Sequence, residues 1–339
     1  MILFTSERRV IMQSETDYVI SQANDQMLLL KSNKKKMSFF KKIRKNKSLL
    51  IMTLPAIIFF LIFNYLPMPG IYLAFINYNY TQGIFRSSFV GMQNFRFLVQ
   101  SGQLQNITKN TVLYNLAFIL LGNCLQVFVA ILLNEISNRR FRKITQTIMF
   151  LPYFISAVIV GLLVYNILNY DYGFLNAVLK SLDIEPVSVY SIPSAWPFII
   201  VLTNLWQGVG YGSVIYFAAI TNIDSEMIEA AAIDGANAFQ KIGYIILPCL
   251  KSTFIILILF ALGGVLRGNF GLFYNLVGNN SLLYPTTDII ETFVFRSLMV
   301  NFNFSASCAV SLYQSVFGCA LVLLCNWIIK KIEPDYALF

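Results

Sequence analysis

Residues 197–221 read P-F-I-I-V-L-T-N-L-W-Q-G-V-G-Y-G-S-V-I-Y-F-A-A-I-T, a stretch with no Asp, Glu, Lys or Arg. A helix of about 20 apolar residues is long enough to cross the hydrocarbon core of a bilayer. We therefore expect this stretch to be a transmembrane helix. Comparable apolar runs occupy residues 49–76, 111–134, 145–168, 252–275 and 309–330. The sequence predicts an all-α, polytopic membrane protein with about six transmembrane helices.

The composition of the whole chain agrees with a membrane protein. Hydrophobic residues make up 57% of the 339 positions, charged residues only 12%, and the mean hydropathy is +0.65. Soluble domains average roughly 25% charged residues, so this chain has too few charges to cover a water-exposed surface. The long unbroken runs also argue against a membrane β-barrel, whose strands alternate between lipid-facing and lumen-facing residues.

The positive charges are distributed unevenly between the two predicted sides of the membrane. Of 25 Lys and Arg, 11 precede Ser48, and 19 in all lie in the two tails and in the loops after the second and fourth apolar runs. The positive-inside rule therefore predicts that both termini are cytoplasmic. A polybasic segment before a membrane helix also attracts anionic lipid, and we interpret the net charge of +9 in this way rather than as nucleic-acid binding.

We divide the chain into three parts on this basis. A basic cytoplasmic tail is expected over residues 1–47, a transmembrane domain over 48–331, and a short cytoplasmic tail over 332–339. Histidine is absent and none of the five cysteines has C-x-x-C spacing, so we expect no metal site and no cofactor. The G-x-x-x-x-G-K-[ST] phosphate loop is also missing, which predicts that this chain hydrolyses no nucleotide.

The segment between the fourth and fifth apolar runs, residues 223–249, is a partly apolar loop. It reads I-D-S-E-M-I-E-A-A-A-I-D-G-A-N-A-F-Q-K-I-G-Y-I-I-L-P-C. Asp224 or Ser225 can cap a helix, the alanines that follow favour its continuation, and Gly235 interrupts it. A second helical pattern runs up to Pro248. Two short helices that meet at a glycine, on the predicted cytoplasmic face, suit the docking of a soluble partner.

This loop, 223–249, resembles the coupling loop of ABC importer permeases, whose signature is E-A-A, three residues, G, nine residues and I-x-L-P. The resemblance implies a type I ABC importer permease fold in which Glu229 anchors a cytoplasmic coupling helix in the ATP-hydrolysing subunit. It further implies a second homologous permease, an ABC ATPase dimer and an extracellular solute-binding lipoprotein, in a bacterial cell membrane. The residues expected to couple to the ATPase are Glu229, Ala230, Ala231, Asp234, Gly235, Leu247 and Pro248.

Further segments resemble the carbohydrate branch of this family, the polysaccharide and oligosaccharide permeases of the LplB type. Residues 65–70 and 91–95 look like the start of those permeases, and residues 288–296 are similar to their D-x-I-D-T-Y-V-Y-R segment. The resemblance implies import of an oligosaccharide. An ABC permease for a non-sugar solute remains an alternative. An ion-coupled secondary transporter is a second one, although it predicts mid-span carboxylates and inverted repeats that the sequence does not show.

Polar and aromatic residues of the fourth run are candidates for sugar contacts. Polar groups in a span should face a cavity, and aromatic rings can stack on a sugar. The resemblance to maltose-type permeases places the sugar site at Gln207, Gly208 and Tyr211, with Asn269 as a further candidate. The glycines near Tyr211 could instead let two helices approach each other. Arg267 is interpreted as a snorkelling residue near the outer end of its span.

Overall fold

The computed structural model describes residues 47–332 of the chain, so the predicted tails lie outside the described residues except at Lys47 and Ile332. The chain divides after Met68 into two compact units, and each is described by itself. In the first unit, helix α3 (Lys47–Phe60) continues into one π-helical turn, Leu61–Tyr65.

The second unit begins with a short, compact segment that is only partly helical. A 3-10 helix, Met68–Phe75, leads into strand β1 (Ile76–Asn77), which pairs antiparallel with strand β2 (Ser88–Phe89). Helix α4 (Gly83–Arg86) lies between the strands, and α5 (Gln93–Gln100) follows them. These two strands, of two residues each, form the one β-sheet in residues 47–332.

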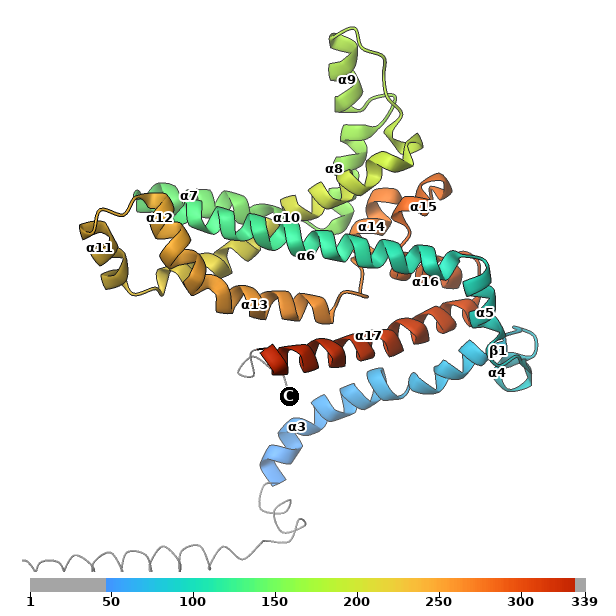
Figure 1. The fold of residues 1–339 in the computed structure, drawn as a ribbon. Coiled ribbons are helices and arrows are strands. Elements are labelled where there is room, and N and C mark those ends of the chain that lie inside the picture. Colours follow the sequence, from blue (N-terminus) through green and yellow to red (C-terminus); the bar gives the residue numbers. More distant parts are fainter. Residues whose placement is uncertain (1–46, 333–339) are drawn as a thin grey trace, which may run out of the picture. The chain divides into compact units, whose positions relative to one another are not determined.

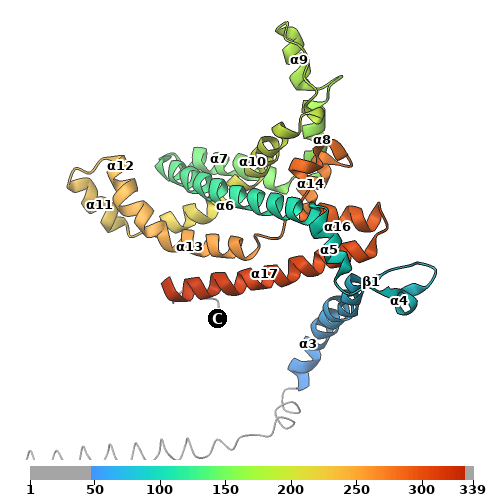
Figure 2. The ribbon, with the colours of Figure 1, turned by 45° about the vertical axis from the view of Figure 1, so that its right-hand side comes forward.

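The remainder of the second unit is a helical bundle, in which α6, α10, α13 and α17 are the long elements (Figure 1). Figure 2 shows the same helices turned by 45°. The α-helices are α6 (Gln103–Glu135), α7 (Arg139–Phe150), α8 (Ala157–Leu168), α9 (Phe174–Ser181), α10 (Trp196–Thr221), α11 (Ser225–Ile233), α12 (Ala238–Lys241), α13 (Leu247–Gly263), α14 (Phe270–Val277), α15 (Tyr284–Thr287), α16 (Ile290–Met299) and α17 (Phe304–Ile332). Short 3-10 turns lie at Leu151–Phe154, Val189–Ser191, Pro193–Ala195 and Ser281–Leu283, and a π-helical turn lies at Ile242–Ile246.

Five helical stretches in residues 47–332 are long and apolar enough to cross a membrane, and a bent pair makes the sixth. The predicted number of about six is confirmed, but the third run, 145–168, is not one straight helix. It bends by 95° between Phe154 and Ala157. Pro152 opens a 3-10 turn there, and Ser156 starts a new helix by accepting a hydrogen bond from the backbone N–H of Ile159.

The boundaries predicted for the fifth span, 252–275, are wrong at both ends. The helical stretch runs from Ala238 to Gly263, and residues 270–277 form the separate helix α14. Pro248 does not end the cytoplasmic helix as expected. It lies inside the continuous helical stretch, directly after the π-helical turn Ile242–Ile246. A local π-helical turn of this kind lets a membrane helix accommodate the missing N–H of a proline. Glycines at the far end, with Gly264 at the C-cap, stop the helix.

The packing of α6 against α10 forms the centre of the bundle. A Cβ added to Gly210 would collide with the backbone carbonyl of Met149, and one on Gly212 would collide with the side chain of Gln126. The buried Tyr216 hydroxyl donates to Asn123 Oδ1 at 2.7 Å, which links the two helices by a polar contact. These two glycines therefore serve helix approach, one of the two roles that the sequence left open.

Candidate functional site

The coupling loop, residues 223–249, is built from local capping interactions. Asp224 caps α11 by accepting a hydrogen bond from the backbone N–H of Glu226 at 3.0 Å. Gly235 ends this helix with φ +79°, a left-handed conformation that glycine adopts without a steric penalty. Asn237 and Gln240 then form a reciprocal capping box at the start of α12. The predicted pair of short helices that meet at a glycine is confirmed.

The surface of the coupling loop is unusually apolar for an exposed segment. The side chains of Ile233, Phe239 and Tyr244 are 87%, 86% and 83% exposed. A hollow of about 280 Å³ lies beside Gly235, between the end of α11 and the start of the next helical stretch. Glu229 is exposed on α11. Apolar side chains that the chain itself leaves uncovered mark a surface for a protein or a membrane.

A buried cluster joins the coupling loop to the membrane helices. Ile246 and Leu250, at the start of α13, pack with Tyr216 and Ile220 of α10 and with Ala130 of α6. All five side chains are buried, and Tyr216 and Ala130 are fully so. Because packed interiors resist compression, a displacement of the loop is transmitted to α10 and α6 rather than absorbed locally.

The predicted sugar contacts on α10 lie beside the 95° bend. The Gln207 side chain donates from Nε2 to the backbone carbonyl of Ile155, inside the bend, at 3.3 Å. A Cβ on Gly208 would meet nothing within 4 Å, so Gly208 faces open space while its neighbour Gly210 faces α7. The ring of Tyr211 stacks on Tyr153 with centroids 4.4 Å apart and an angle of 10° between the planes.

The aromatic platform at the bend consists of Tyr211, Tyr153, Phe154 and Phe150. Tyr211 and Tyr153 are 43% and 48% exposed, and Phe154 is 71% exposed. The rings of Phe150 and Tyr211 lie 5.7 Å apart. Exposed, supported aromatic faces of this kind can stack on a flat apolar ligand surface. The three partners of Tyr211 were not predicted from the sequence, and Pro152 within an apolar run was the signal that could have located the bend.

Asn269 lies in the connector between α13 and α14, residues 264–269. Its Oδ1 accepts a hydrogen bond from the backbone N–H of Leu272 at 3.1 Å, so Asn269 caps α14. A Cβ added to Gly271 would lie 3.4 Å from Ala157, which follows the bend that Gln207 binds. Helix α14, which Asn269 caps, therefore packs on α8 and α10, and the Oδ1 atom of Asn269 is engaged in that cap.

Polar side chains from three helices hold the connector in place. Asn115 of α6 donates to the backbone carbonyl of Val265 at 3.0 Å. Gln314 of α17 donates to the carbonyl of Leu266 at 2.6 Å. Glu291 of α16 accepts from the backbone N–H of Gly268 at 2.7 Å. Irregular backbone at membrane depth needs such partners, and it normally lines a cavity.

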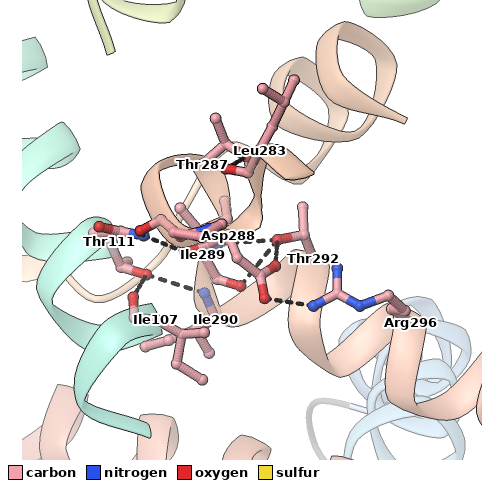
Figure 3. Close-up of polar contacts among 11 residues, drawn as sticks. Ile107, Thr111, Leu283, Thr287, Asp288, Ile289, Ile290, Thr292 and Arg296 are labelled. Atoms are coloured by element: carbon pink, nitrogen blue, oxygen red, sulfur yellow. Dashed lines mark hydrogen bonds and ion pairs between the residues drawn. The ribbon is translucent and has the colours of Figure 1, made fainter. Parts of the chain in front are cut away.

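The segment 288–296 forms a polar cluster of its own, which we name the Asp288–Arg296 cluster (Figure 3). The Asp288 carboxylate accepts from Thr292 Oγ1 at 2.7 Å and pairs with the Arg296 guanidinium. That guanidinium also lies over the ring of Tyr284, 3.9 Å from its centroid. The backbone N–H of Ile290 donates to Thr111 Oγ1 of α6 at 3.0 Å (Figure 3). These contacts fasten α15 and α16 to α6.

Residues 122–336 match the model of one protein family, described as "Binding-protein-dependent transport system inner membrane component". The chain belongs to this family. The coupling loop and all the helices from α7 to α17 fall within the matched residues, and the predicted type I importer permease fold is confirmed. The chain is thus a multi-pass translocation subunit of the ABC importer type and not an enzyme, as the sequence predicted.

Proteins similar to this chain match it over nearly its whole length. It is 31% identical to Protein LplB of Bacillus subtilis (strain 168) over 89% of this chain and 94% of the relative. A solved bacterial ABC transporter involved in the import of the acidic polysaccharide alginate has a chain with 32% identity and a TM-score of 0.78. The match covers 87% of this chain and 99% of that one.

A second solved structure shows a similar transporter with its delivery protein. It is a bacterial alginate ABC transporter in complex with an alginate pentasaccharide-bound periplasmic protein, and one of its chains is 32% identical to this one with a TM-score of 0.77. That match covers 87% of this chain and 98% of the other. The predicted resemblance to the LplB branch is confirmed, and the family assignment disfavours an ion-coupled secondary transporter.

Proposed function

We propose that this chain is the permease subunit of an ATP-driven importer that moves oligosaccharides or polysaccharide fragments across the cell membrane. The observation that carries the proposal is the coupling loop, which is exposed, apolar and joined to α6 and α10 by a buried cluster. The sugar cargo is supported by the similarity to the importer of the polysaccharide alginate. An ABC permease for a non-sugar solute is the rival that the cargo assay below tests.

The proposed partners follow from the family and from the loop. A dimer of ABC ATPases would cover the exposed side chains of the coupling loop, with Glu229, Ala230, Ala231, Asp234, Gly235, Leu247 and Pro248 as the coupling residues. A second, homologous permease would complete the pathway, and an extracellular solute-binding lipoprotein would deliver the cargo. Both termini would then be cytoplasmic, on the side of the ATPase.

The proposed coupling mechanism is a shift between two conformations. ATP binding closes the ATPase dimer and displaces the loop that holds Glu229, and the displacement favours the conformation of the bundle that fits the closed dimer. Because Ile246 and Leu250 pack directly on α10, this helix receives the displacement. The helix that carries the candidate sugar contacts is therefore the one that the coupling loop moves.

The proposed sugar contacts are Gln207, Gly208, Tyr211 and Asn269. Tyr211 and its stacked partner Tyr153 offer an exposed aromatic face, and Gly208 leaves room above α10 for a ligand. The side-chain NH2 groups of Asn269 and Gln207 can donate hydrogen bonds to the hydroxyl oxygens of a sugar.

The substitution Glu229→Ala tests the coupling assignment. In proteoliposomes with the second permease, the ATPase and the binding protein, we expect stimulation of ATP hydrolysis by the loaded binding protein to fall at least about tenfold. Chromatographic profile and thermal unfolding of the permease should not change, because Glu229 is exposed. Glu185→Ala, an identical change at an exposed position before the 3-10 turn Val189–Ser191, is the matched control.

Unchanged stimulation and unchanged assembly in the Glu229→Ala complex would contradict the coupling role. The same proteoliposomes test the cargo when alginate pentasaccharide and an amino-acid mixture are supplied in turn. Uptake of an amino acid and not of the sugar would overturn the sugar assignment and leave the ABC permease assignment intact.

A further inference from the structure

The connector 264–269 forms one wall of a cavity of about 830 Å³. Its other walls come from α13, from Glu291 of α16 and from one face of α17. The α17 residues that line it are Gln314, Ser315, Gly318, Cys319 and Val322. This cavity lies on the α17 side of the connector and includes none of the sugar contacts proposed above.

The cavity lies at the depth of the hydrocarbon core. Helix α17 has 29 residues and is about 43 Å long at 1.5 Å per residue, so it exceeds the roughly 30 Å core of a bilayer. Gln314 stands about 15 Å from the Phe304 end, and Gly318 and Val322 are deeper still. Gln314 also contacts Leu266, the residue before Arg267. Arg267, four residues beyond the Gly263 end of its own helix, lines this cavity, and the interpretation that its side chain snorkels stays a prediction.

The Glu291 carboxylate in this wall is committed to the backbone of the connector. Its Oε1 accepts hydrogen bonds from the Gly268 N–H and from Gln314 Nε2, each at 2.7 Å. Its Oε2 is buried and has no hydrogen-bond partner among the described residues. A Cβ at Gly268 would overlap with this carboxylate, so the close approach depends on glycine. Glu291 thus fixes the connector and offers no oxygen atom to a ligand in the cavity.

Arg267, unlike Glu291, has its charged group exposed to the cavity. Its side chain is exposed along the cavity wall, and within residues 47–332 it forms no ion pair. A charged side chain within a span is costly unless it meets water or a counter-charge. Guanidinium groups bind carboxylates through two parallel hydrogen bonds, which fixes both position and orientation. The charged group that the cavity presents is therefore the one that recognises a carboxylate.

We propose that this cavity is a subsite for acidic sugars and that Arg267 is a specificity-determining residue that binds the carboxylate of a uronate unit during passage. The inference rests on the proposed function and narrows its substrate class from oligosaccharides in general to uronate-containing ones. Gln314 and Ser315, on the facing helix α17, have their donor hydrogens engaged within the protein. Their oxygens, Oε1 and Oγ, line the cavity as acceptors for the hydroxyls of the same sugar.

The test compares one sugar in two charge states. The reconstituted complex, with its binding protein, is supplied with alginate pentasaccharide or with the methyl ester of that pentasaccharide, which keeps the backbone and removes the charge. We expect Arg267→Gln to lower uptake of the acid at least about tenfold and to change uptake of the ester by less than about twofold. Arg267→Lys keeps the positive charge but cannot form both parallel hydrogen bonds, so its uptake of the acid should lie between that of the wild type and that of Arg267→Gln.

Arg86→Gln is the matched control, because Arg86 is exposed on α4 and lies outside the cavity. Arg86→Gln should leave the ratio of acid uptake to ester uptake unchanged. Equal loss of both substrates in Arg267→Gln, no loss of either, or dissociation of the second permease would overturn the inference. Wild-type uptake of the ester without the acid, or of neither, would overturn it while the proposed function stands. Uptake of an amino acid and of no oligosaccharide would contradict the proposed function itself.

Discussion

The coupling loop and the Asp288–Arg296 cluster use polar side chains in opposite ways. In the loop, Asp224 and Asn237 bond to backbone groups two or three residues away, and the apolar side chains around them stay exposed. In the cluster, Asp288 is buried and pairs with Arg296, and the neighbouring backbone bonds to α6, nearly 180 residues away in sequence. One region is folded by its own sequence, and the other depends on the rest of the bundle.

This difference separates stability from function along the chain. A local loop can keep its shape while its surface remains available to a partner, so substitutions on that surface should alter coupling before they alter folding. A buried charged pair holds distant segments together, and removal of one partner leaves the other charge uncompensated. Three substitutions test the comparison, in order of decreasing expected effect on stability.

Arg296→Leu should have the largest effect. It leaves the Asp288 carboxylate buried without its cation and removes the contact with the Tyr284 ring, which we expect to destabilise the protein by about 3–5 kcal/mol. Thermal unfolding of the detergent-purified permease measures the loss, with Arg86→Leu as the exposed control. The double variant Asp288→Asn/Arg296→Leu should recover part of it. A double variant as unstable as the two losses added together would contradict the pairing.

Gly210→Ala should have an intermediate effect. Its Cβ would collide with the Met149 carbonyl, and such overpacking costs about 1–3 kcal/mol. Gly208→Ala is the matched control two residues away, where nothing lies within 4 Å, and its stability should be unchanged or slightly raised. Equal effects of the two changes would contradict the assignment of Gly210 to helix approach. Loss of sugar uptake in Gly208→Val at unchanged stability would support a ligand above this face.

Gly235→Ala should have the smallest effect on stability. A side chain at φ +79° costs about 1–2 kcal/mol, but the loop can fray without opening the bundle. We expect unchanged global unfolding, faster hydrogen exchange over residues 225–241, and weaker ATPase stimulation in the complex. Gly243→Ala, an open position at negative φ in the same loop, is the control. A marked loss of global stability in Gly235→Ala would show that the loop is not locally folded.

The sequence by itself determined the features that depend on neighbouring residues or on bulk composition. Apolar runs of bilayer length predicted the number of spans, because the hydrocarbon core requires that length whatever the helices pack against. The cap at Asp224 and the break at Gly235 followed from side-chain and backbone preferences over a few residues. The family resemblance of the coupling loop followed in the same way, because its spacing is a property of one contiguous segment.

Only the tertiary structure decided the features made by contacts between distant segments. The bend at Pro152 places Tyr153 against Tyr211, 58 positions later in the chain. The fifth span ends at Gly263, and side chains from α6, α16 and α17 supply the hydrogen bonds that its irregular connector needs. Arg267 follows the end of that span, and the packing of α17 makes it part of a cavity wall, which the apolar run alone did not indicate. The physical reason is the same in each case: hydropathy measures how a segment meets lipid, and it carries no information on which polar groups meet each other.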